Sequence, residues 1–107
     1  MGKGKIKIND KNIETYERVI PGKDTTLHVI AGSTGYKGCN KREAGGRTYI
    51  RIKCLRGDFY FEPIEDDDER VTGIEIACCG DEGLDAIMKA LEFAVEVIDD
   101  ERCGINK

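Results

Sequence analysis

The part of the sequence most suggestive of chemistry is a glycine-rich segment, residues 32–47, which separates two stretches that alternate like strands. It holds five of the 13 glycines of the chain. A simple hairpin needs only a few connecting residues. A longer segment rich in glycine is expected to leave backbone N–H groups exposed and to let a ligand approach closely. Exposed amides beside lysine and arginine are a common means of binding an anion, most often phosphate.

Charge is segregated along the chain in a way that favours this interpretation. Residues 32–56 contain seven lysines or arginines and one acid, whereas residues 57–75 contain eight acids and one arginine. The net charge is −4, so the positive charge is local. We predict a phosphate-bearing small ligand, with a base stacked on Tyr36 or Tyr49. The predicted ligand-binding residues are Gly32, Ser33, Thr34, Gly35, Tyr36, Lys37, Arg42, Gly46, Arg47, Tyr49 and Arg51.

Other interpretations of these segments stay open. The glycine-rich segment also fits a solvated hairpin loop or a contact with a protein partner. Its spacing matches neither the P-loop nor the dinucleotide-binding fingerprint. The acidic run at 65–69 is typical of a solvated loop, although it also suits a mimic of nucleic-acid phosphates. Duplex DNA is not expected as a partner, because it would need a broad basic face.

Catalytic and metal-binding patterns are not evident. His28 lies within an apolar alternating stretch with no nucleophile patterned beside it, which is more typical of a structural histidine than of a general base. The five cysteines, Cys39, Cys54, Cys78, Cys79 and Cys103, lack paired metal-ligand spacing. We expect reduced thiols in apolar positions, no catalytic residues, no metal and no cofactor.

Alternation of apolar and polar residues predicts several strands. Period-two patterns occur near residues 5–8, 27–31, 49–54 and 72–78, and residues 59–61 follow a short turn that suggests a hairpin with the strand before it. Residues 13–20 fit either a helix or a strand, and we favour a strand. The expected fold is α+β in a single domain, 1–107, with a mostly antiparallel β-sheet and a C-terminal α-helix packed on one face.

The predicted helix spans about residues 82–100, with Asp81 as its N-cap. Its charged residues fall within an arc of roughly 100° and leave an apolar arc about twice as wide as one sheet requires. We assign one apolar side, which includes Leu84, Met88 and Leu91, to the sheet. The other side then needs a second cover, either the N-terminal segment or another subunit. The predicted oligomer interface consists of Ala86, Ala90, Phe93 and Val97.

Three stretches carry a resemblance to a known class of proteins. They begin at Gly32, Gly45 and Gly80 and read GSTGYKG, GGRTYIRI and GDEGLDAIMKALEFA. Over about residues 25–100 the chain resembles small proteins of bacteriophages and mobile elements that antagonise bacterial immunity. Some proteins of this class sequester cyclic-nucleotide signals as oligomers, and others bind CRISPR effectors.

This resemblance and the predicted phosphate site together favour a non-catalytic, oligomeric protein that sequesters a cyclic nucleotide or another phosphate-bearing small ligand in the cytoplasm of a bacterial host. One alternative is an anti-CRISPR-like inhibitor that binds a defence protein through its acidic surface. A second alternative is a small virion or structural protein. No apolar run approaches the roughly 20 residues of a membrane span, so we expect no membrane contact.

Overall fold

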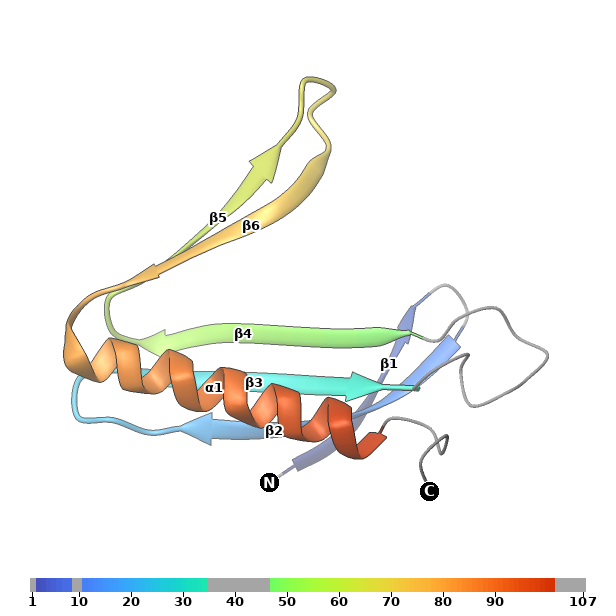
Figure 1. Ribbon diagram of the computed structural model, residues 1–107, viewed down its shortest axis with the longest axis horizontal. Helices are drawn as coiled ribbons and strands as arrows, with labels where there is room; N and C mark the ends of the chain where they lie inside the picture. Colours follow the sequence, from blue (N-terminus) through green and yellow to red (C-terminus); the bar gives the residue numbers. More distant parts are fainter. Residues whose placement is uncertain (1, 9–10, 35–46, 102–107) are drawn as a thin grey trace.

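The computed structural model describes residues 2–8, 11–34 and 47–101, which form six strands and one helix (Figure 1). All the strand pairs are antiparallel, and the predicted α+β class is confirmed. The favoured strand over residues 13–20 is also confirmed. The elements are β1 (Gly2–Ile8), β2 (Lys11–Ile20), β3 (Thr26–Ser33), β4 (Thr48–Arg56), β5 (Phe59–Glu65), β6 (Val71–Cys78) and α1 (Gly80–Glu101).

Strands β1 to β4 form one sheet in chain order, and α1 lies across one face of it, mainly over β3. Alternate residues of β3 point to the helix, so Leu27, Val29 and Ala31 are all completely buried. They pack against Phe93 and other small or apolar residues of α1. The core therefore lies between β3 and one side of the helix.

Strands β5 and β6 form a separate two-stranded sheet that projects from the rest of the molecule as an arm (Figure 1). The predicted hairpin between the strand at 49–54 and residues 59–61 is wrong. The turn at 56–58 includes Gly57 with a φ of 118°, and it directs the chain away from β4. Strand β5 then pairs with β6. Two sheets replace the single predicted sheet, and β4 is an edge strand of the larger one.

The two apolar sides of α1 have roles opposite to those predicted. Ala86, Ala90, Phe93 and Val97, the predicted oligomer interface, are at most 7% exposed and pack against the sheet of their own chain. Small residues on this side allow the helix to lie close to β3. The side assigned to the sheet, with Leu91 at its middle, is instead exposed.

The N-terminal end of α1 is anchored to the loop between β2 and β3. The backbone N–H of Asp24 donates a hydrogen bond of 2.6 Å to Glu82 Oε2. This bond, together with bonds from Thr25 and Lys23, lowers the pKa of Glu82. The same loop accepts hydrogen bonds through the carbonyls of Gly22 and Lys23 from Arg56 Nη2. The helix, this loop and the end of β4 are thereby joined.

Candidate ligand-binding site on strand β4

Strand β4 presents different chemistry on its two sides. It pairs with β3 so that Ile52 lies opposite Val29 and Cys54 opposite Leu27, which places these apolar residues on the helix side of the sheet. Residues between them point the other way. Arg51 and Lys53 therefore lie on the sheet face opposite the helix.

Tyr49, Arg51 and Lys53 form a row on that face, which we call the β4 row. Alternate residues of a strand are about 6.6 Å apart, so the row places one aromatic ring and two cations in a line. Arg51 and Lys53 are exposed, and Tyr49 is half-buried. Neither cation has a salt-bridge partner among the described residues. Both charges are available to an anion from solvent.

The neighbouring strands add little negative charge to this face. Arg51 lies opposite Ile30, and Lys53 lies opposite His28. The Nε2 atom of His28 is 3.2 Å from Glu17 Oε2, so the carboxylate on this face pairs with the imidazole. The electrostatic environment of the β4 row therefore favours an anionic ligand.

At the end of the sheet next to residues 35–46, the predicted neutral donors bond within the protein. Ser33 is buried and its Oγ lies 3.0 Å from Thr48 Oγ1. The backbone N–H of Arg47 donates to Thr34 Oγ1 at 2.8 Å. These bonds hold β3 and β4 together at the base of the glycine-rich segment. The side chains of Ser33 and Thr34 therefore have hydrogen-bond partners within the protein, and no ligand is needed to explain them.

Gly32 also has a structural explanation. A Cβ built on this residue would lie 2.2 Å from the backbone oxygen of Glu14, so β2 and β3 approach too closely for any side chain. Glycine is required here for packing between strands. This close contact explains why residue 32 is glycine, and no exposed amide for a ligand has to be assumed.

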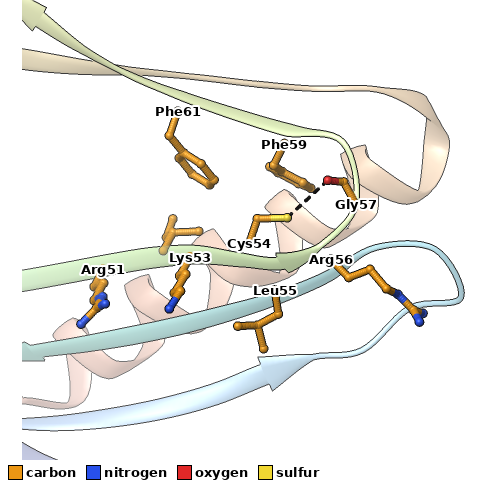
Figure 2. Close-up of a pocket in the computed structure, with 9 residues that line it drawn as sticks. Arg51, Lys53, Cys54, Leu55, Arg56, Gly57, Phe59 and Phe61 are labelled. Carbon is orange, nitrogen blue, oxygen red and sulfur yellow. Dashed lines mark hydrogen bonds between the residues drawn. The ribbon is translucent and has the colours of Figure 1, made fainter.

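A shallow groove runs along the free edge of β4 (Figure 2). Phe59 and Phe61, from β5, lie on the same side of β4 as Cys54, and their rings stack with centroids 6.0 Å apart. Arg51 and Lys53 extend from the opposite side of the strand. The groove thus has an apolar side and a cationic side, and a ligand that contacts both must cross the strand edge.

The predicted ligand-binding residues are only partly brought together. Arg51 and Tyr49 share the β4 row, and Arg47 lies just before β4 on the same segment. The prediction omitted Lys53 from the site, although its alternation with Arg51 and Tyr49 was visible in the sequence. Five of the predicted residues lie outside the described residues: Gly35, Tyr36, Lys37, Arg42 and Gly46.

Cysteine chemistry in the described part of the chain is that of free thiols. Cys54 is half-buried, while Cys78 and Cys79 are both exposed. The expectation that cysteines fill apolar positions therefore holds for Cys54 and fails for Cys79, which is exposed between the end of β6 and the start of α1. Cys39 and Cys103 lie outside the described residues. Within residues 2–8, 11–34 and 47–101, there is no group of three or more His, Cys, Asp or Glu side chains placed to hold a metal ion.

Family models, curated proteins and solved structures were compared with the chain, and none of them matches it. Among the described residues, there is also no helix long and apolar enough to cross a membrane.

Proposed function

We propose that this protein binds a small phosphate-bearing ligand without catalysing a reaction, and that the β4 row is the described part of its site. The observation that carries the proposal is the pair of exposed cations, Arg51 and Lys53, which have no salt-bridge partner among the described residues. Hydrogen bonds from such cations to phosphate oxygens are stronger than neutral ones. Tyr49, next in the row, provides a ring face for a nucleobase.

The proposed ligand of the β4 row is a cyclic nucleotide. A cyclic nucleotide combines phosphates for Arg51 and Lys53 with a base for Tyr49. The resemblance to phage proteins that antagonise immunity suggests sequestration of such a signal in a bacterial cytoplasm. Residues 35–46 of the glycine-rich segment lie outside the described residues, and their contribution to the site stays a prediction from the sequence.

Calorimetric titration with cyclic mono-, di- and trinucleotides tests this proposal. At least one of them should bind, and Arg51→Ala should weaken binding by about 1.5 to 3 kcal/mol, which is about ten-fold or more in affinity. Lys53→Ala should act in the same direction, and added salt should weaken binding further. Lys89→Ala, which removes a lysine from the exposed face of α1, is the matched control and should bind normally.

Two results would contradict the proposal. One is that no nucleotide binds to the wild-type protein. The other is that a nucleotide binds with equal affinity to wild type, Arg51→Ala and Lys53→Ala, which would move the ligand away from the β4 row. Recovery of an intact nucleotide after heat denaturation of the complex is expected, because the proposed site has no catalytic role.

A second candidate function is inhibition of a defence protein through the acidic arm. The arm projects from the sheet, so a partner can reach its tip. Asp66 stabilises the turn there, because its Oδ1 accepts backbone hydrogen bonds from Asp68 and Arg70. Asp67 and Asp68 are exposed. On this alternative, Asp67→Asn with Asp68→Asn should abolish partner binding while Arg51→Ala has no effect.

A further inference from the structure

The β5–β6 arm has an apolar face that is largely uncovered. Directly paired residues project from the same face of a sheet, so the register from Phe59↔Cys78 to Pro63↔Ile74 places only apolar residues on this face. Ile74 is 63% exposed. An isolated two-stranded hairpin is marginally stable in water, so a partner surface is expected. The arm face consists of Phe59, Phe61, Pro63, Ile74, Ile76 and Cys78.

The exposed side of α1 is a second apolar surface. Leu84, Met88, Leu91 and Val95 are each about half exposed or more, and their spacing of three or four residues makes them a continuous row along the helix. We call these four residues the helix row. Soluble monomers rarely leave a row of this length uncovered, and large apolar patches usually mark interaction sites.

The arm face and the helix row lie on the same side of the molecule. Tyr16 and Arg18 of β2 contact the helix near Phe93 and Glu96. At 100° per residue, the helix row is centred about 140° from the residues that pack on the sheet, on the side of α1 away from β2. Ile50 of β4, which lies on the helix side of the sheet, is itself 50% exposed. The arm face begins at the same place, because Phe59 and Phe61 line the groove beside β4.

We propose that a second copy of this chain covers both surfaces, with the arm face of each copy packed on the helix row of the other. In a two-fold dimer, both subunits use the same surface, and each part of it contacts the complementary part of the partner. The arm face and the helix row are apolar and of similar length, so each can pack on the other across the two-fold axis. One dimer contact would then bury both surfaces of both chains. This dimer is independent of the proposed ligand, because it uses none of Tyr49, Arg51 and Lys53.

The size of the exposed surface agrees with a dimer. The exposed parts of the helix row, the arm face and Ile50 amount to on the order of 500 Å² of apolar area. Each partner of a stable complex buries roughly 800 Å² in total, of which somewhat more than half is apolar. One chain therefore carries about as much apolar surface as its half of a standard interface requires.

Charge makes a nucleic acid a poor occupant of these surfaces. The helix row is flanked by Asp85, Glu92 and Asp99, and the far end of the arm carries the acidic run at 65–69. A polyanion would be repelled from both sides. A second copy instead brings an apolar surface to the centre and leaves the acidic residues in solvent at the rim, as in most protein interfaces.

Sedimentation of the wild type and three variants tests the proposal. The wild type should be a dimer at micromolar concentration. Leu91→Asp in the helix row and Ile74→Asp in the arm face should each weaken the dimer roughly thirty-fold or more, the effect of a central interface residue. Val19→Asp is the matched control, because Val19 is also 50% exposed but lies on the sheet face opposite the helix. It should remain dimeric.

Mixing the two monomeric variants tests the exchange of surfaces. A mixed dimer has one damaged contact and one intact contact, between the normal arm of the Leu91→Asp chain and the normal helix of the Ile74→Asp chain. Partial recovery of the dimer is expected on mixing, whereas neither variant alone should recover. Absence of recovery would overturn the reciprocal contact, since pairing of arm with arm or helix with helix gives no intact contact.

Two further results would overturn the proposal. A wild-type protein that sediments as a monomer throughout the micromolar range leaves these surfaces to another occupant or to closure of the arm within its own chain. A dimer that survives both variants is held by different residues. Circular dichroism checks that each variant keeps its fold, and the milder Leu91→Gln and Ile74→Thr replace any variant that unfolds.

Discussion

Replacing Phe93 by alanine tests which side of α1 packs on the sheet. Phe93 is 4% exposed and contacts the core formed by β3 and the helix. Its ring also lies 5.7 Å from Arg18 Cζ, a distance at which a cation–π interaction contributes. Truncation of a buried phenylalanine leaves a cavity and costs about 3 to 5 kcal/mol. We expect Phe93→Ala to lower the free energy of unfolding by about that amount.

Leu91→Ala is the matched change on the exposed side of the same helix. Leu91 is 49% exposed in the single chain, so its truncation should cost about 1 kcal/mol or less. Urea unfolding followed by circular dichroism measures both variants, at a protein concentration low enough to keep the chain monomeric. At higher concentration, the cost of Leu91→Ala should grow if the proposed dimer forms, because dissociation is then part of unfolding.

An equal loss of stability for Leu91→Ala and Phe93→Ala in the monomer would contradict this packing of the helix. That result would mean that the helix packs on the sheet by the side originally predicted from the sequence. The substitutions differ by two residues along one helix and lie about 160° apart around it. The comparison is therefore sensitive to rotation of the helix about its axis and insensitive to its overall position.

Three other predictions follow from the fold. Gly32→Ala should destabilise the protein by about 1 to 3 kcal/mol in urea unfolding, because its Cβ would collide with the backbone oxygen of Glu14; an unchanged midpoint would contradict the close strand contact. Hydrogen bonds lower the pKa of Glu82, so its contribution to stability is present above the unfolded pKa of about 4.3 and is lost as the pH falls through the lower folded pKa. The difference in melting temperature between wild type and Glu82→Gln should therefore be largest at neutral pH and shrink in acid, while Glu92→Gln should show little difference at either pH. Thiol labelling of the native protein should modify Cys79 faster than Cys54, because Cys79 is exposed and Cys54 is half-buried, and equal rates would contradict this difference in exposure.

Local patterns in the sequence were sufficient to predict most of the secondary structure. Alternation identified the segments that became β3, β4 and β6, because a half-buried strand repeats every two residues. The helix was evident from its period and from the glycine and acidic residues at its start. Strand β2 was harder to predict, since Tyr16 and Ile20 fit a helical spacing equally well. Its pairing with β1 and β3 in the structure shows that the segment is a strand.

The candidate site was predicted only in part. The local excess of lysine and arginine led to Arg51, and alternation along one strand places Lys53 beside it. The sequence could not show that Ser33 bonds to Thr48, or that Gly32 meets the backbone of Glu14. Both contacts join segments that are distant along the chain, and glycine, serine and threonine have the same local appearance in a ligand site and in a strand contact.

The sequence by itself determined that α1 has an apolar arc too wide for one sheet, because residue type and the 100° rotation per residue set that width. Only the tertiary structure decided which half of the arc the sheet covers. Small residues such as Ala90 allow close approach to β3, while Leu91 is exposed on another side of the helix. Likewise, the residues around Gly57 indicated a turn, but only the structure showed that Gly57 lies against Thr25 of the loop between β2 and β3. The turn directs β5 away from β4, so that β5 pairs with β6 and the arm is left uncovered.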